Sequence, residues 1–411
     1  MTTMDSGLFS RLRNTYAPVL AIPGVPRLLG GVFIAGTDVG LVPVGLVLMV
    51  STHFHSYARS GLILAAYGIG SATWPVVQAW LFRRYGARRC VLPLAALAAS
   101  ALIVVLATCM APSPLPAIAA AGIAGAGRPS LAAALRDAWP GLVGFDKELL
   151  SAAVALDASV FELLYLTGAA AGAAVVALAP PMFALVAAIV AIVAGALLFV
   201  SAGPLPSSVD PAAPAGRGSR FWYVIGWAPF GLVFGAYEEV APAFATGRHP
   251  GTSGMLLALT AVGSTLIAIG YGLRRGAGRA EWVIPAGLGA AAGLLALVSL
   301  QDTMPVAALL AILLGAVFAP FAVETTRALA GVTTPLLWSM TLLVLGNAAG
   351  NAIAGALVDQ MGWRVASAVV ATMGLVGAIA IAVARPRGAT GRQSADPAPA
   401  ADGAAEAPLP G

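Results

Sequence analysis

The stretch GTDVGLVP at residues 36–43 reappears in altered form as GAYEEVAP at residues 235–242. Both stretches begin with Gly, end with Pro seven positions later and carry acidic side chains inside a long apolar run. Two further echoes follow in the same order: RRYGARRCVLP at 83–93 resembles RRGAGRAEWVIP at 274–285, and the pair Gly168 and Gly172 resembles Gly346 and Gly350. Repeats of this kind predict two related helical halves.

The composition excludes a soluble fold. Of the 411 residues, 59% are hydrophobic and 9% are charged, against about 25% charged in an ordinary soluble domain. The two cysteines, Cys90 and Cys109, would lie about 28 Å apart along one helix, which excludes a disulfide-stapled secreted domain. The net charge of +5 is spread between apolar segments, so we expect no nucleic-acid partner.

Twelve apolar stretches are each about 20 residues long, the length needed to cross a membrane as a helix. We therefore predict an all-α integral membrane protein with two pseudo-symmetric bundles of six helices. The predicted parts are a cytoplasmic segment at 1–27, a first bundle at 28–203, a cytoplasmic linker at 204–220, a second bundle at 221–384 and a disordered cytoplasmic tail at 385–411.

The basic residues predict the orientation. With the first residues inside the cell, eighteen of the 22 Lys and Arg residues fall in cytoplasmic segments, as the positive-inside rule requires. The sequence therefore predicts a multi-pass protein of a bacterial plasma membrane with both ends in the cytoplasm. Residues 1–26 are too polar and too long for a cleaved signal peptide.

The turn between the second and third predicted spans carries a recognisable motif. Arg84, Gly86 and Arg88 match the loop signature of the major facilitator superfamily, which this chain resembles over about 28–384, whereas Ala79 and Arg83 stand where the family has Gly and Asp. The stretches ALDASVFELLYLTG at 155–168 and GALVDQMGWR at 355–364 resemble a drug-efflux-like group of such transporters in actinobacteria.

The resemblance implies a transporter that rocks two halves around a central cavity. It also implies that, with Arg83 in place of the family's Asp, a cytoplasmic latch either uses another acid or is weaker. Two other family motifs are also incomplete. The Arg of the fourth span would fall near Ala121, and the Gly-Pro of the fifth-span antiporter motif would fall near Gly172; both are absent. These losses weaken the case for proton antiport more than the case for the fold.

Ionisable residues inside spans need a partner, water or a function. Asp38 lies near the predicted midplane, where it would carry protons, contact a cationic substrate or make a structural hydrogen bond to a neighbouring helix. Glu238 and Glu239 point about 100° apart on their helix. One of them is expected to face the central cavity and the other a neighbouring helix or outer water; a solvated helix end is the alternative.

The fourth and fifth spans carry Arg128, Asp157 and Glu162. Arg128 and Asp157 are at similar distances from the loop between these spans, which predicts a buried ion pair between them. The pair would be structural, or it would open during transport when substrate or a proton competes for Arg128.

Two smaller groups complete the candidates. Glu324 and Arg327 are three residues apart at a helix end and can form a pair, and Glu324 can also replace the missing loop Asp by meeting Arg83 or Arg84. Asn347 and Asn351 share one helical stripe, either for close packing or for lining the cavity. No nucleotide, metal or hydrolase motif is present, so we expect no enzyme activity and no cofactor.

We therefore predict a monomeric secondary transporter in the lipid bilayer that exports a small organic molecule by alternating access, with protons as the coupling ion. The alternatives are a proton-coupled uptake symporter for a metabolite and a membrane protein that senses or scaffolds without transporting. Direction rests on the resemblance alone.

Overall fold

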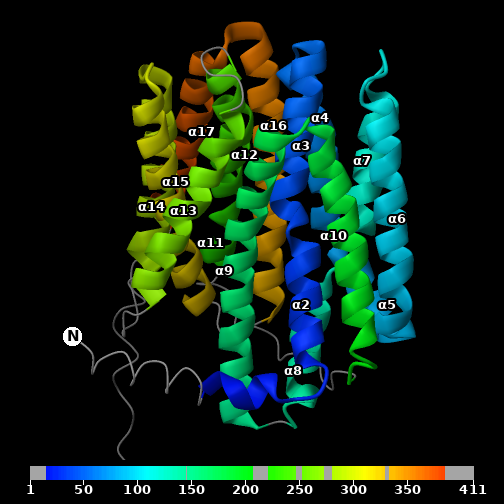
Figure 1. Cartoon of the computed structure of the whole chain (residues 1–411). Helices are drawn as coiled ribbons and strands as arrows, with labels where there is room; N and C mark the ends of the chain where they lie inside the picture. Colours follow the sequence, from blue (N-terminus) through cyan, green and yellow to red (C-terminus); the bar gives the residue numbers. More distant parts are fainter. Residues whose placement is uncertain are drawn as a thin grey trace, which may run out of the picture.

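The computed structural model confirms the predicted all-α membrane fold. The helices stand side by side as one upright bundle, with the first half of the chain on one side and the second half on the other (Figure 1). The structure describes residues 15–144, 146–206, 221–246, 252–272, 280–328 and 333–384. Most of the predicted linker at 204–220 and the whole predicted tail at 385–411 lie outside the described residues, so their structure stays a prediction.

In the first half, several spans are divided into two helices. The helices of this half are α2 (Val25–Gly36), α3 (Asp38–Phe54), α4 (Tyr57–Thr73), α5 (Pro75–Tyr85), α6 (Ala87–Thr108), α7 (Leu115–Gly127), α8 (Leu131–Leu142), α9 (Lys147–Leu178) and α10 (Met182–Ser201).

The helices of the second half are more continuous. They are α11 (Phe221–Ile225), α12 (Trp227–Thr246), α13 (Ser253–Gly272), α14 (Ala280–Leu300), α15 (Met304–Ala328), α16 (Thr333–Met361) and α17 (Trp363–Ala384).

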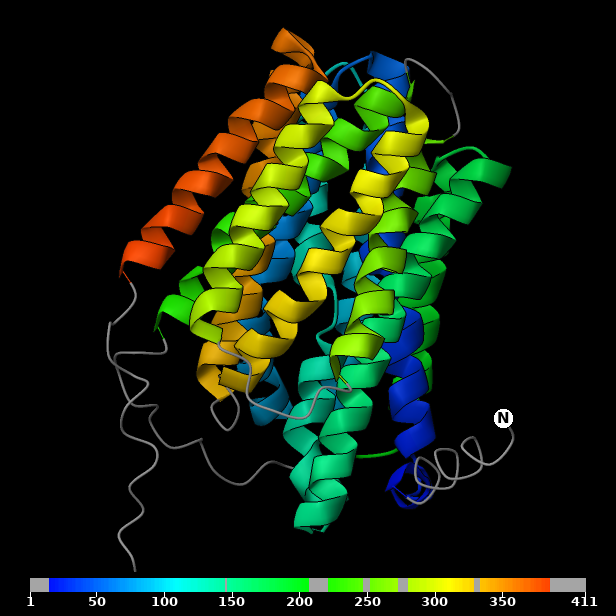
Figure 2. The same ribbon diagram turned by 90° about the vertical axis from the view of Figure 1, so that its left-hand side faces the viewer.

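The described helices group into long columns, most of which are long and apolar enough to cross a membrane. Eight stretches are long and apolar enough to span, and α4 and α5 form a ninth if their 41° bend is counted within one span. With α9, α12 and α13, the described part of the chain has twelve columns, consistent with the predicted twelve spans. The turn from α8 to α9 extends furthest at the lower end of the bundle (Figure 2).

Local sequence explains where several helices begin and end. Ser56 and Asp146 accept backbone N–H groups at the starts of α4 and α9, which satisfies donors that a helix leaves unpaired. Between α5 and α6 the turn is the single residue Gly86, whose φ of 83° suits Gly. The predicted Gly-containing turn between the second and third spans is therefore confirmed.

Each half has a hydrophobic core of its own. One cluster of buried residues runs from Val19 to Phe199, and the other is centred on Trp227 to Ile381. The second cluster also includes Val44 and Leu48 of α3. The upper part of α3 therefore packs against the opposite half, and the halves are in contact there.

The glycine pairs predicted as a repeat make equivalent contacts in the two halves. A Cβ at Gly172 of α9 would lie 2.7 Å from the carbonyl oxygen of Gly40 in α3, and a Cβ at Gly350 of α16 would collide with the carbonyl oxygen of Leu232 in α12. The fifth column thus packs closely on the first, and the eleventh packs closely on the seventh. Small residues permit this approach where lipid provides no hydrophobic drive.

The two halves are joined at the upper end of the bundle, where α3 ends and α4 begins (Figure 1). The carboxylate of Asp359 in α16 accepts hydrogen bonds from Ser56 Oγ at 2.7 Å, from the Tyr57 amide at 2.6 Å and from the Ala58 amide at 2.9 Å. A carboxylate at a helix N-terminus is favoured by the helix dipole. We call this cluster, together with Ser60 and Glu239 below it, the upper contact.

Close packing of α12 on α16 gives a direct test. A Cβ at Gly235 would collide with the backbone carbonyl of Asn347, whereas a Cβ at Gly293 of α14 would meet nothing within 4 Å. We expect Gly235→Ala to destabilise the protein by about 1–3 kcal/mol and to lower its unfolding temperature in detergent. The matched variant Gly293→Ala should unfold at the wild-type temperature or slightly above it. Equal effects of the two variants would contradict this packing.

Candidate functional site

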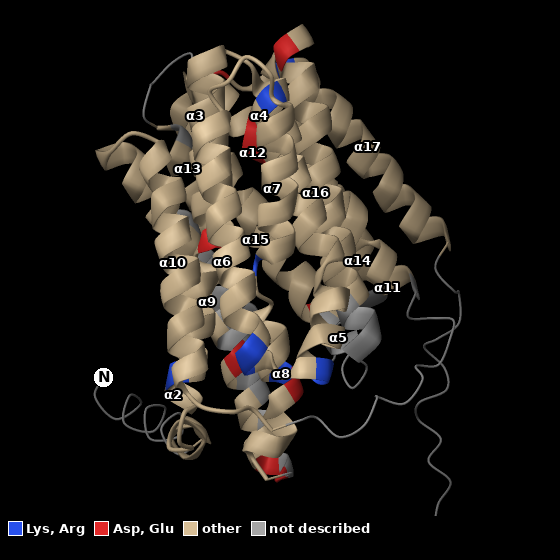
Figure 3. Ribbon diagram, turned by 90° about the vertical axis from the view of Figure 1, so that its right-hand side faces the viewer, with Lys and Arg blue, Asp and Glu red and all other residues tan. Residues whose placement is uncertain are grey.

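Charged residues are sparse between the two ends of the bundle (Figure 3). One of them is Asp38, the first residue of α3, which is fully buried. Its carboxylate forms an ion pair with Arg128, in which Nε donates to Oδ2 and Nη2 donates to Oδ1 at 2.8 Å. The hydroxyl of Tyr67 in α4 donates to Oδ2 at 3.0 Å. Both carboxylate oxygens are therefore satisfied, as a buried charge requires.

Arg128 reaches Asp38 because the fourth column breaks at this level. Residues 128–130 separate α7 from α8, and Pro129 lies in the break. The buried side chain of Gln78 in α5 forms hydrogen bonds to the backbone around this break. Its Nε2 donates to the carbonyls of Ala126 at 3.0 Å and Arg128 at 2.8 Å, and its Oε1 accepts the Ser130 amide at 2.8 Å. Backbone groups freed by the break thus find partners inside the protein.

The predicted ion pair between Arg128 and Asp157 is wrong. Asp157 instead pairs with Arg136 of α8, whose Nε lies 2.6 Å from Oδ2. Because α8 ends at Leu142 and α9 begins at Lys147, Asp157 lies level with about residue 132, midway between the two arginines. Depth alone does not select the partner, and the break at Pro129 brings Arg128 to Asp38. The side chain of Glu162 lies outside the described residues.

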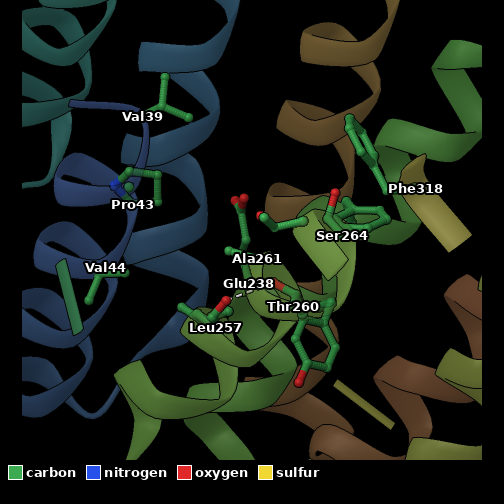
Figure 4. Close-up of a pocket in the computed structure, with 13 residues that line it drawn as sticks. Val39, Pro43, Val44, Glu238, Leu257, Thr260, Ala261, Ser264 and Phe318 are labelled. Atoms are coloured by element: carbon green, nitrogen blue, oxygen red, sulfur yellow. Dashed lines mark hydrogen bonds between the residues drawn. The ribbon is translucent and has the colours of Figure 1, made fainter. Parts of the chain in front are cut away.

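Glu238 lies at a cavity between the halves. The cavity, of about 150 Å³, is lined by α3 on one side and by α12, α13 and α15 on the other. The Glu238 side chain projects between Val39 and Pro43 of α3 and Ser264 and Phe318 opposite (Figure 4). The remaining lining is mostly apolar and aromatic, with hydroxyls from Thr260, Ser264 and Thr265. Such a cavity suits a small organic molecule held by few polar contacts.

An amide from α16 positions the Glu238 carboxylate. Nδ2 of Asn351 lies 3.0 Å from Oε2 of Glu238 and also 3.0 Å from Oδ1 of Asn347. Asn351 is fully buried, and the glycines beside these amides bring α12 and α16 together. The structure therefore supports close packing with hydrogen bonding for the asparagine stripe; neither amide is among the residues that line this cavity, although Asn351 holds Glu238, which does line it.

Glu239 faces a different surface from its neighbour, as the 100° step between adjacent residues predicts. It is fully buried in the upper contact, where Oε2 lies 3.1 Å from Oγ of Ser60 in α4. Its Oε1 has no hydrogen-bond partner among the described residues. One acid of the pair thus lines the cavity and the other bridges the halves.

The basic motif lies at the lower end, where Arg83 and Arg84 belong to the last turn of α5 and Arg88 to the first turn of α6. Arg83 acts electrostatically on Asp137 of α8, so it has an acid within its own half. Glu324 is buried in α15; its pairing with Arg83 or Arg84 stays a prediction. The side chain of Arg327 lies outside the described residues, so its pairing with Glu324 also stays a prediction.

Comparison with known proteins assigns the family. Residues 28–336, more than half of the 411-residue chain, match the family model described as Major Facilitator Superfamily. This chain belongs to the major facilitator superfamily. Membership makes it a transporter rather than an enzyme. A search of curated proteins found no match.

Solved structures of several transporters share the fold. An auto-inhibited POT family peptide transporter superposes with a TM-score of 0.69 at 13% identity, covering 88% of this chain and 96% of that one. The nucleoside transporter NupG gives 0.63 at 13% identity, covering 87% and 98%. The human organic anion transporter MFSD10 (TETRAN) gives 0.63 at 15% identity, covering 87% and 98%. At such identities the likeness shows the fold alone.

Several residues of the site in this superfamily member were not predicted from the sequence. Tyr67, Gln78 and Ser60 are polar residues inside apolar spans, and that is the signal that could have singled them out. Asp137 shares the lower end with the basic motif and could have been considered as its acid. The partners of Ser60, Tyr67 and Gln78 cannot be predicted from the neighbouring sequence, because each contact joins different helices.

The buried ion pair makes a testable prediction. Removing one partner leaves the other charge buried and unpaired, which costs about 3–5 kcal/mol. We therefore expect Arg128→Gln and Asp38→Asn each to lower the unfolding temperature in detergent strongly, and the double variant to be more stable than either single variant. Arg136→Gln in combination with Asp38→Asn is the matched control and should show no such recovery. Additive losses in the Asp38 and Arg128 double variant would contradict the pair.

Proposed function

We propose that this chain is a proton-coupled exporter of amphipathic, cationic small organic molecules. The observation that carries the proposal is the cavity between the halves, in which Glu238 is the acidic residue among apolar and aromatic side chains. A single carboxylate in an apolar wall selects for one positive charge, since an unpaired charge in such a site is unfavourable. The aromatic rings of Phe234, Tyr237 and Phe318 suit a flat apolar group or a cation.

Asp38 is the proposed proton carrier of the first half. Val39 and Gly40, which follow it directly, line the same cavity. A proton on Asp38 would neutralise the carboxylate that holds Arg128, so proton binding would loosen the ion pair. The pair thereby links protonation to the arrangement of α3 and of the break between α7 and α8.

The charge distribution supports the predicted orientation, with the lower end in the cytoplasm of a bacterial cell. Arginines at the upper end are Arg59 and Arg364, at the starts of α4 and α17. Arginines near the lower end are more numerous in the described part of the chain. They are Arg27, Arg83, Arg84, Arg88, Arg89 and Arg136. In this orientation both ends of the chain are cytoplasmic, and the protein acts as a monomer in the lipid bilayer.

Transport into inverted vesicles tests the proposal. We expect vesicles with an acidic interior to accumulate a flat fluorescent monocation such as ethidium, and addition of the cation to release protons from the interior. Glu238→Gln should reduce the accumulation rate by about tenfold or more, equivalent to about 1.4 kcal/mol. Asp38→Asn should abolish the proton release. Glu148→Gln, which removes an exposed carboxylate at the start of α9, is the matched control and should transport as wild type.

Other outcomes would select the alternatives. Accumulation in right-side-out vesicles with an acidic exterior would indicate an uptake symporter. An absence of transport and of proton movement across a wide panel of cations, anions and neutral compounds would indicate a sensor or scaffold. Transport of the cation that is unchanged in Glu238→Gln would refute the role of the cavity carboxylate.

A further inference from the structure

Ser60 and Glu239 meet where the two halves touch. The number of hydrogens available at this contact bears on whether the Glu239 carboxyl group carries a proton. Ser60 Oγ lies 2.9 Å from the carbonyl oxygen of Tyr57 and 3.1 Å from Oε2 of Glu239. A hydroxyl has one proton to donate. If Ser60 donates to Tyr57, as residues one helical turn apart commonly do, the contact with Glu239 lacks a hydrogen unless the carboxyl group supplies it.

We propose that Glu239 binds a proton in the upper contact, and that this proton is required for the two halves to close there. The protonated carboxyl group donates from Oε2 to Ser60 Oγ, and Ser60 donates to the Tyr57 carbonyl. This chain of donors satisfies both contacts of the hydroxyl. The inference rests on the proposed function only in giving the closure a place in a transport cycle.

The remaining oxygen of Glu239 supports the neutral form. Within the part of the chain that the structure describes, Oε1 is buried without a hydrogen-bond partner, and so is Oδ1 of Asn351 in α16. Each of these two side chains therefore carries an acceptor without a donor, whereas the buried Nη1 of Arg59 in α4 is a donor without an acceptor among the described residues. Leaving a buried charged oxygen unpaired costs more than leaving a neutral carbonyl unpaired, and a proton on Glu239 both removes the charge and adds a donor.

The charges around Glu239 do not favour its ionised form. Those that act on it are the acids Glu238 in its own helix and Asp359 in α16. In α4, the Tyr57 hydroxyl lies 3.4 Å from Thr246, and the guanidinium of Arg59 lies over the ring of Phe54. Arg364 of α17 is paired with Asp302. The α13 sequence carries no charged residue.

Opening of the upper contact would change this environment. Ser60 belongs to the first half and Glu239 to the second, so separation of α4 from α12 breaks their hydrogen bond and admits water to the carboxyl group. A carboxyl group in water is ionised at neutral pH. Because the closed arrangement binds one more proton than the open one, low pH favours closure and rising pH favours opening.

The experiment measures the separation of the halves directly. Spin labels are placed at His53 of α3 and Met361 of α16, both exposed at the upper end, in the full-length chain with Cys90→Ala and Cys109→Ala. Distances are measured by pulsed electron paramagnetic resonance in nanodiscs between about pH 5 and about pH 9. We expect a short distance at low pH and a growing population with a longer distance as the pH rises.

Three variants assign the response. Glu239→Gln, a neutral mimic that still donates a hydrogen bond, should keep the short distance at every pH. Glu148→Gln, which removes an exposed carboxylate at the start of α9, is the matched control and should retain the pH response. Ser60→Ala should open at lower pH than the unsubstituted labelled protein, because the protonated carboxyl loses its acceptor. A Glu239→Gln protein that opens with pH, or that is open at every pH, would overturn the proposal.

A second measurement uses the wild-type protein and so does not depend on whether the Glu239→Gln protein folds. Infrared difference spectroscopy of the wild-type protein should show the carbonyl band of a protonated carboxylic acid at low pH, disappearing over the range in which the halves separate; its absence would overturn the proposal. The outcome is separable from the exporter proposal. A protein that moves no cation yet shows the Glu239-dependent distance change retains the proton site, and cation export with a pH-independent distance refutes the proton site alone.

Discussion

The structure depends on one constraint, that backbone polar groups inside a bilayer must find their partners within the protein. This constraint accounts for the helical columns and also for what happens where a column breaks. The gap between α7 and α8 exposes carbonyl and amide groups at mid-depth, and Gln78 satisfies three of them from another helix. These hydrogen bonds stabilise the break between the helices at which Arg128 reaches Asp38.

The adjacent acids of α12 show how one helix can serve two surfaces. Glu238 and Glu239 differ by a single step in sequence, yet one lines the cavity and the other lies between α12 and α4. The helical rotation between neighbours produces this division without any additional secondary structure. A substrate contact and a contact between the halves are therefore rigidly linked, because they belong to the same turn of helix.

The sequence predicted the periodic features of the protein and missed those that depend on tertiary contacts. Helical spans, the turn at Gly86 and the paired glycines of α9 and α16 follow from local patterns, and the structure contains all of them. The partner of Asp157 could not be predicted from depth, since two arginines, Arg128 and Arg136, flank its level equally. Ser60 and Gln78 acquire their roles from helices distant in sequence, which no local pattern specifies.

Asp359 caps the first turn of α4 from a position about 300 residues further along the chain. During synthesis, α4 enters the membrane long before α16 exists. At that stage Ser56 can already accept the Arg59 amide, as it does at 3.3 Å in the folded protein, while the amides of Tyr57 and Ala58 are left to water. The same local cap is available whenever Asp359 withdraws. Ser56 thus makes the N-terminus of α4 tolerable in two settings, the unfinished nascent chain and a mature protein whose halves have parted.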